Sequence, residues 1–300
     1  MRILRYTLSY FFIFILLLFT QGCANQPSEA NTTQKKSIGL LWKISKKNTP
    51  TSYLFGTMHS EDERVISLPP AVTKAFKAST TFALEMALDE TTTKSVLANM
   101  YFSDGKRLDQ LLTSDVYKQT IKAMQEKGLP EDIVAHMKPW AIFTILNMPD
   151  QKTGLFLDAL LYKSAQKLNK KIVGLETPKE QTDVFDGMPM DVQVSLLKST
   201  LKNALDMDAI LEKTLQVYLS KDLDAILVLN DKYLELVEKD VGDLFTKRLV
   251  TDRNHRMVER IIPQITQDKL FIAVGALHLP GEQGIINLLR NHGYEVQAIY

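Results

Sequence analysis

Cysteine is nearly absent from this chain: Cys23 is the only one among 300 residues. A single cysteine excludes an intramolecular disulfide. Charge of one sign is also lacking, because the formal net charge is +1. Proteins that bind nucleic acid usually show a strong basic excess, so we expect no nucleic-acid partner.

Several motifs of well-known enzyme classes are missing as well. The chain has no His-Glu-x-x-His, no Gly-x-Ser-x-Gly and no phosphate-binding loop. The only cysteine lies outside the domain that we expect to fold, so nucleophilic cysteine chemistry is not expected either.

The N-terminus carries the features of an export signal. Arg2 and Arg5 precede an apolar run at residues 10–19, which is shorter than the roughly 20 residues of a membrane-spanning helix. We predict that residues 1–22 are a signal peptide. Without them two arginines are lost and the net charge falls from +1 to −1.

Cys23 follows this signal directly and resembles the lipid-attachment cysteine of bacterial lipoproteins. Residues 23–37 are polar and read as a lipidated flexible tether. We therefore expect a lipid anchor that holds the protein at the periplasmic face of a bacterial membrane. The alternatives are an uncleaved anchor, or plain secretion if Cys23 is not lipidated.

Residues 38–300 have the pattern of an α/β domain. Short apolar runs near both ends and at 171–176 predict strands, and helical periodicity fills about 89–150 and about 177–263. Strands that are apolar on both faces are typical of a buried parallel sheet. We predict a central, mainly parallel sheet built from N- and C-terminal strands, with a large helical insertion.

Four ionisable residues stand where apolar runs end: His59, Glu85, Glu176 and His278. The two histidines share one local setting, an apolar run that ends in Gly-x-x-His. The carboxyl ends of parallel strands meet at the same edge of a sheet, where ligands bind. The sequence therefore predicts two imidazoles and two carboxylates at one site.

Such a group of side chains suits a divalent metal ion. Two histidines with a carboxylate fit zinc, and more oxygen ligands would fit manganese or cobalt. We predict that His59, His278 and Glu85 hold the ion and that Glu176 takes a proton from water. The alternative is structural: a strand-end histidine is often satisfied locally, and Glu176 could cap the helix that starts at Thr177-Pro178.

Arg253 and Asn254 lie in a helical stretch between apolar residues. An arginine that faces inward could neutralise a carboxylate or stabilise an oxyanion. We expect both residues to orient a substrate. The alternative is an arginine on the exposed face of an amphipathic helix.

Five segments resemble the TraB/GumN family, to which the Tiki proteins are related: "YLFGTMH", "FALEM", "KIVGLET", "LVTDRNHRMVERI" and "FIAVGALHLPGEQGIINLLRNHGYEV". The resemblance runs from about Leu40 to Tyr300. It implies an α/β core related to erythromycin-esterase-like and haem-binding ChaN-like proteins. Tiki relatives resemble metal-dependent proteases that use manganese or cobalt.

The family motifs match this chain at His59, Glu85, Glu176, Arg253, Asn254 and His278. The chain departs from the family at Asp158, which follows "TGLFL" without the usual proline, so we do not assign Asp158 to the site. The resemblance implies a metal-dependent hydrolase, and peptides are the substrate class that the Tiki relatives suggest. Two alternatives are a non-enzymatic lipoprotein that binds haem or a peptide, and a metal-free, esterase-like hydrolase.

Overall fold

The computed structural model describes residues 38–148, 153–202, 207–234 and 239–300. The predicted signal peptide, the tether and Cys23 lie outside these residues, so their assignment stays a prediction. Within the described ranges, every helix is too short or too polar to cross a bilayer.

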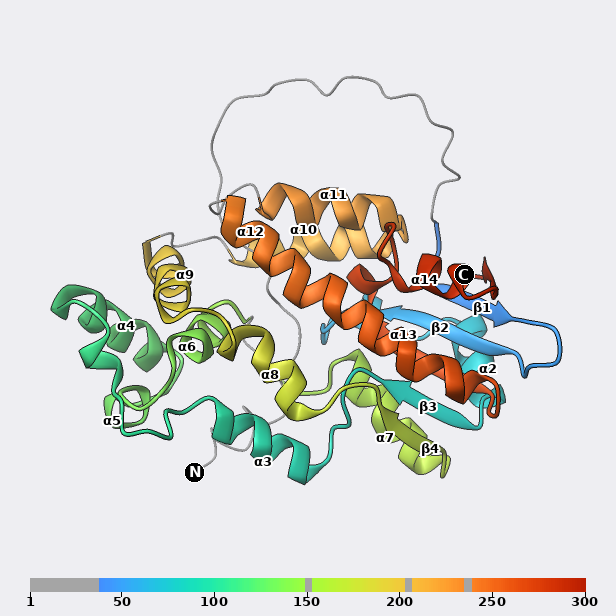
Figure 1. Cartoon of the computed structure of the whole chain (residues 1–300), viewed down its shortest axis with the longest axis horizontal. Helices are drawn as coiled ribbons and strands as arrows, with labels where there is room; N and C mark the ends of the chain where they lie inside the picture. The colour runs from blue at the N-terminus through green and yellow to red at the C-terminus, as the bar shows by residue number, and fades with distance from the viewer. Residues whose placement is uncertain (1–37, 149–152, 203–206, 235–238) are drawn as a thin grey trace, which may run out of the picture.

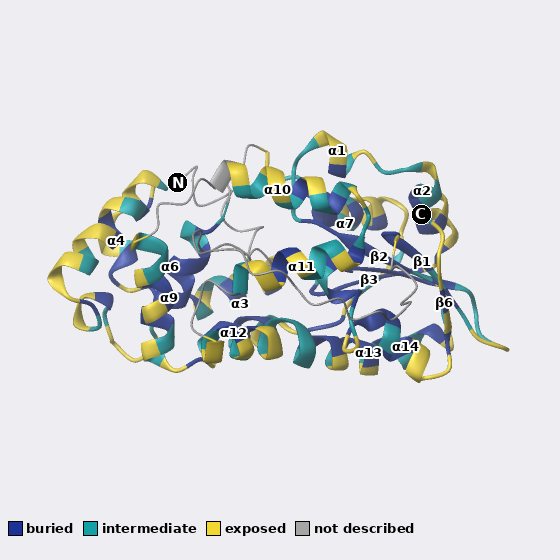
Figure 2. Cartoon of the chain, turned by 90° about the horizontal axis from the view of Figure 1, so that it is seen from above, coloured by how far each residue is buried: buried dark blue, intermediate teal, exposed yellow. Residues whose placement is uncertain are grey.

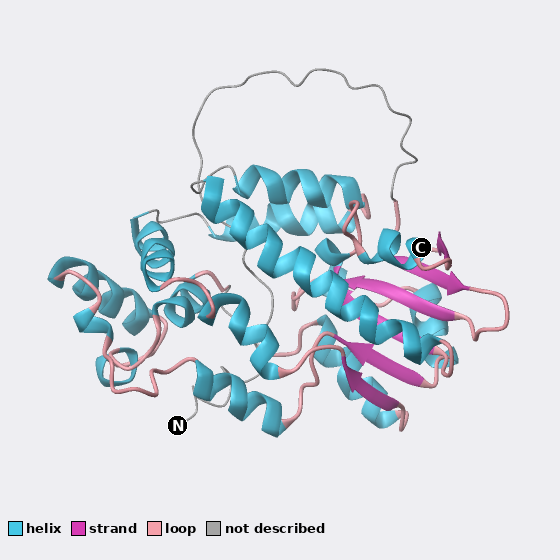
Figure 3. Cartoon of the chain, in the orientation of Figure 1, coloured by secondary structure: helices cyan, strands magenta, loops and turns pink. Residues whose placement is uncertain are grey.

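The centre of the molecule is one sheet of six strands in the order β4-β3-β5-β2-β1-β6 (Figure 3). The strands are β1 (Leu41–Ser45), β2 (Ser52–Thr57), β3 (Thr81–Leu84), β4 (Lys171–Gly174), β5 (Leu270–Gly275) and β6 (Glu295–Ala298). The pairs β4-β3, β3-β5 and β5-β2 are parallel, and β1 runs antiparallel to both β2 and β6. This confirms the predicted α/β fold with a mainly parallel sheet.

Helices cover both faces of the sheet, which explains its uninterrupted apolar strands. In Figure 2, α13 (Asp252–Ile265) and α14 (Ile285–Asn291) lie on one side of the sheet. On the other side lie α1 (Glu63–Ile66), α2 (Pro70–Ala78) and α7 (Leu157–Lys167). Accordingly, every residue of β3 and β5 is buried.

Two helical stretches lie between strands of the sheet along the chain. Between β3 and β4 come α3 (Glu90–Asn99), a 3-10 turn η3 (Leu108–Gln110), α4 (Ser114–Glu126), α5 (Glu131–Val134), α6 (Pro139–Leu146) and α7. Between β4 and β5 come α8 (Pro178–Asp186), α9 (Met190–Lys202), α10 (Met207–Leu219), α11 (Leu223–Leu234), α12 (Lys239–Thr246) and α13.

The helices α4, α5, α6 and α9 gather at the end of the molecule away from the sheet (Figure 1). They enclose a second apolar core, in which the rings of Trp140 and Phe185 stack with their centroids 5.8 Å apart. Phe245, on α12, packs edge-on against Phe185. Because α12 continues through a π-helical turn, η4 (Lys247–Thr251), into α13, one run of backbone joins this second core to the sheet.

Candidate active site

Four strand ends supply the site. Because β4, β3, β5 and β2 are parallel neighbours, their carboxyl ends lie at the same edge. Glu176, Glu85, His278 and His59 follow these four strands, so the structure brings the predicted residues to one edge. Glu85, Glu176 and His278 are buried, whereas His59 keeps some exposure.

His278 lies in η5 (Ala276–His278), a short turn after β5, and its tautomer follows from its neighbours. The side-chain Nδ2 of Asn254 donates to the carbonyl oxygen of Gln283 at 2.8 Å. The Oδ1 atom of Asn254 therefore faces the imidazole, 2.6 Å from Nδ1, which must carry the proton. Burial lowers the pKa of His278 to about 4, so its Nε2 atom bears a lone pair at neutral pH.

Glu85 lies opposite that lone pair. Its Oε1 atom is 3.7 Å from Nε2 of His278 and accepts the backbone N–H of Gly275 at 2.8 Å. Burial alone would raise the pKa of Glu85, but the charge of Arg253 holds this pKa below its ordinary value. Two electron-rich atoms, a carboxylate oxygen and an imine nitrogen, thus face each other, and a cation between them would stabilise both.

His59 and Asp158 form a second pair. Thr57 donates its hydroxyl to Oδ1 of Asp158 at 2.8 Å, and Nδ1 of His59 is 3.6 Å from Oδ2. Among the described residues, this buried Oδ2 atom has no hydrogen-bond partner. The ring of His59 stacks on Phe156 at 4.6 Å, which fixes the plane of the imidazole. Burial raises the pKa of Asp158.

Asp158 is the residue beside His59 that the sequence left unassigned. It lies in the first turn of α7, 101 positions from Thr57 along the chain. No local sequence motif therefore predicts that the two residues meet. One signal was present: Asp158 stands next to Leu157 and three residues before Leu161, on the apolar face of its helix. A carboxylate on a buried face needs a partner or a ligand.

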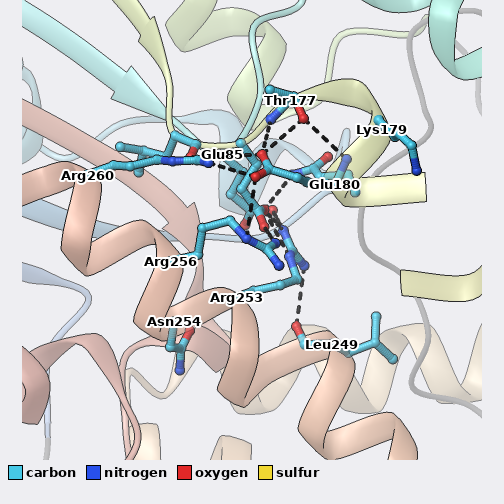
Figure 4. A network of polar contacts seen from close by, with 12 residues as sticks. Glu85, Thr177, Lys179, Glu180, Leu249, Arg253, Asn254, Arg256 and Arg260 are labelled. Carbon is cyan, nitrogen blue, oxygen red and sulfur yellow. Dashed lines mark hydrogen bonds and ion pairs between the residues drawn. The ribbon is translucent and has the colours of Figure 1, made fainter. Parts of the chain in front are cut away.

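An arginine cluster fixes the carboxylates from the other side (Figure 4). Arg253 donates Nη2 to Glu85 at 2.5 Å, and Nε and Nη2 to Oε2 of Glu176 at 2.9 and 2.8 Å. Arg256 binds Oε1 of Glu176 at 2.7 Å, and Gln181 donates to Oε2 at 3.0 Å. Both oxygens of Glu176 are thus occupied. This geometry favours a positioning role for Glu176 over the predicted proton transfer.

The same geometry bears on Arg253 and Asn254. Arg253 is only 3% exposed and neutralises two carboxylates, which is one of the two roles that the sequence allowed. Burial would lower its pKa, but the charges of Glu85 and Glu176 raise it, so the guanidinium is charged. Asn254 is fully buried and bonds to His278 and Gln283. Both residues therefore orient other side chains of the site, and direct contact with a substrate stays a prediction.

A cavity of about 120 Å³ opens beside the two histidines. His59, His278 and Arg253 form its polar end. Its wall is mostly apolar and comes from α10, α11, α12, η4 and the segment after β5: Val217, Tyr218, Ile226, Leu229, Leu234, Phe245, Leu249, Val250, Ala276 and Leu277. A bond to be cleaved could reach the histidines from this cavity.

The donor atoms fit a divalent ion as two half-sites. A neutral imidazole whose other nitrogen is already hydrogen-bonded is the usual state of a metal-ligating histidine, and His278 has that state. The unpartnered oxygen of Asp158 has the chemistry of a further donor. Within the described ranges, however, no three His, Cys, Asp or Glu side chains are already close enough to hold an ion together. Binding would have to draw the two pairs together.

Comparison with known proteins assigns the family. The model of the TraB/PrgY/gumN family matches residues 40–298. The chain belongs to the TraB/PrgY/gumN family. The match confirms the family resemblance that the sequence motifs indicated. No solved structure matches it.

Three relatives show the range of the similarity. Metalloprotease TIKI2 of Xenopus tropicalis is 25% identical over 318 residues, which cover 88% of this chain and 60% of the relative. Metalloprotease TIKI1 of Homo sapiens is 24% identical over 349 residues, which cover 96% of this chain and 69% of the relative. Uncharacterized protein YbaP of Shigella flexneri is 24% identical over 245 residues, which cover 80% of this chain and 88% of the relative. The chain therefore spans about 60% of the length of TIKI2.

Proposed function

We propose that this TraB/PrgY/gumN family member is a metal-dependent hydrolase that cleaves peptides. One observation carries the proposal: the unprotonated Nε2 atom of His278 faces the ionised carboxylate of Glu85 at 3.7 Å. A cation placed between these two atoms would bind both of them, in addition to the charge that Arg253 already supplies to Glu85. The metalloprotease names of the TIKI relatives support a peptide as the substrate.

His278, Glu85 and His59 would hold the ion, with manganese, cobalt or zinc as the candidates. A bound divalent ion supplies Lewis-acid polarisation of the carbonyl group that is attacked. The protein contributes the orientation of its ligands. Asn254 fixes the ring of His278, and Phe156 fixes the ring of His59.

Asp158 is the group best placed to accept the proton of the attacking water, because Thr57 fixes one oxygen and leaves the other free. Arg253 keeps Glu85 ionised and in place. Glu176 in turn holds Arg253, and we assign it this positioning role in place of proton transfer.

The two other candidate functions have less support. The cavity of about 120 Å³ is well below the roughly 300–1,000 Å³ of sites for drug-sized ligands, so it does not favour haem. A metal-free esterase would need a nucleophile beside the pair of His59 and Asp158. Among the described residues that line the cavity there is no serine or cysteine, and the hydroxyls of Thr57 and Thr214 already donate to Asp158 and to the carbonyl oxygen of Ile210.

The test combines metal binding with cleavage. The purified chain is stripped with chelator, titrated with Mn²⁺, Co²⁺ and Zn²⁺ by calorimetry, and then incubated with a peptide library. We expect one ion to bind and to restore cleavage. His278→Gln and His59→Gln should each abolish binding, whereas His292→Gln, at an exposed helix end, should not. Unchanged affinity in His278→Gln would refute the proposed site.

We further propose that the protein is exported and anchored by lipid at Cys23. The support is the sequence pattern of residues 1–23, which the relatives and the described residues leave open. In a bacterial host the wild type should enter the membrane fraction and incorporate radiolabelled palmitate. Cys23→Ser should lose the label and leave the membrane. Label retained by Cys23→Ser would contradict the proposal.

A further inference from the structure

The cavity beside the histidines has a lining with almost no charged side chains. Apart from Arg253, whose charge is bound by Glu85 and Glu176, the described residues that line it include no Asp, Glu, Lys or second Arg. A charged group would lose its hydration there without gaining a partner. The cavity therefore selects for an uncharged, apolar group.

The size of the cavity limits that group to one side chain. A cavity of about 150 Å³ lined by Leu, Ile and Phe holds a benzene molecule in another protein. The cavity here measures about 120 Å³, a volume that suits a leucine or phenylalanine side chain and is too small for a long acyl chain. Its polar end at His59 and His278 places that side chain next to the reacting bond.

Asn230, on α11, adds a polar element to the apolar wall. Its side chain is only 7% exposed and lines the cavity. Its Nδ2 atom donates to Oδ1 of the adjacent Asp231 at 3.3 Å, and its amide oxygen is the hydrogen-bond acceptor that Asn230 brings to the cavity wall. A nearly buried amide oxygen gains a hydrogen bond when a ligand supplies a donor. Peptide backbones carry such a donor, and acyl chains do not.

We propose that this cavity is the specificity pocket of the hydrolase. It takes one uncharged apolar side chain of a peptide beside the cleaved bond, and Oδ1 of Asn230 accepts a backbone N–H of the same peptide. The inference rests on the proposed function for its reference to cleavage, but binding tests it independently.

Binding is measured by calorimetry with short blocked peptides, acetyl-Ala-Leu-Ala-amide and acetyl-Ala-Asp-Ala-amide, on the full chain. The leucine peptide should bind at least about tenfold more tightly than the aspartate peptide. Ile226→Trp, which fills the cavity, should lose at least about tenfold in affinity for the leucine peptide. Val228→Trp is the matched control, since Val228 lies on the same helix and is 69% exposed. Val217→Trp fills the cavity from α10 if Ile226→Trp fails to fold.

The role of Asn230 needs a second probe, in which an ester oxygen replaces one amide N–H of the leucine peptide at a time. One such ester should bind the wild type several-fold more weakly than the amide, and Asn230→Ala should bind both alike. Equal binding of every ester by the wild type would overturn the role of Asn230. Equal affinity for leucine and aspartate peptides, or full affinity in both filled variants, would overturn the pocket.

Cleavage then separates the two proposals. If the leucine peptide binds selectively but no library peptide is cleaved with any metal, the hydrolase proposal fails and the pocket stands. If peptides are cleaved with no preference for an apolar side chain, the pocket fails and the hydrolase proposal stands.

Discussion

Two groups of charged residues share one edge of the sheet, and they differ in how completely they are satisfied. Around Glu176, arginines and a glutamine occupy every carboxylate oxygen. Around Asp158, Thr57 donates to one oxygen, and the other, 3.6 Å from His59, has no hydrogen-bond partner among the described residues. Saturated charges contribute rigidity and leave nothing for a ligand, whereas an unsatisfied one costs stability and is available for chemistry.

Breaking the saturated group should have the largest effect on stability. Arg253→Met would leave Glu85 and Glu176 buried without their shared cation, at a cost of about 3–5 kcal/mol in the free energy of unfolding. Urea denaturation measures it. Arg256→Met is the matched variant on the same helix, and because Arg256 is 30% exposed it should cost only about 1 kcal/mol. Equal losses would show that burial does not separate the two arginines.

A change at Asp158 should remove activity and leave the stability of the protein almost unchanged. Asp158→Asn keeps the shape of the side chain but cannot accept a proton, so the rate of peptide cleavage should fall about 10²–10⁴-fold. The free energy of unfolding should change by less than about 1 kcal/mol, because no ionised partner is lost. Asp109→Asn, on an exposed turn, is the control. A large loss of stability in Asp158→Asn would place Asp158 with the saturated group.

The sequence predicts the residues at the strand ends, but it does not predict their partners. His59, Glu85, Glu176 and His278 were predictable because each ends an apolar run, and parallel strands bring their ends together. The partners of these residues were not predictable. Arg253 reaches Glu85 across 168 positions, and Asp158 reaches Thr57 across 101, through helix placements that no local pattern encodes.

Metal affinity should reveal the contribution of Asn254, which orients His278 and is not itself a proposed ligand. Asn254→Ala removes the acceptor that fixes the tautomer of His278, so Nε2 would lose its preference for the unprotonated state. We expect metal affinity to fall about 10–100-fold, as for other residues that orient a metal-binding histidine. Calorimetry with Mn²⁺ measures it, and Asn291→Ala, at the exposed end of α14, is the control. Unchanged affinity would argue against the assigned tautomer.

The smallest effect concerns Glu180, at the edge of the arginine cluster. Hydrogen bonds from Arg260 lower the pKa of Glu180 from 4.5 to about 2, against the opposing effect of burial. Because the folded-state pKa is depressed, the stabilisation is complete above pH 4.5 and is lost as pH falls toward 2. We expect about 1 kcal/mol, since the pair is partly exposed to solvent. The difference between wild type and Glu180→Gln in urea should therefore shrink over that range. A constant difference would contradict this.

The fold was more predictable than the site. Apolar runs near both ends and at 171–176 predicted strands, and helical periodicity predicted the stretches that contain α3 to α6 and α8 to α13, whereas α1 was not predicted. These features depend on neighbours along the chain. The cavity depends on the packing of α10, α11 and η4 over the sheet edge, which amphipathic patterns permit but do not determine.

The π-helical turn η4 links two properties of the protein. It contributes Leu249 and Val250 to the cavity wall and leads directly into Arg253. A π turn holds one residue more than the matching α-helical turn, so deleting one residue there would change the cavity wall and leave α13 in register with the helix before it. The wall can therefore vary in length at this turn while the guanidinium of Arg253 keeps its carboxylates.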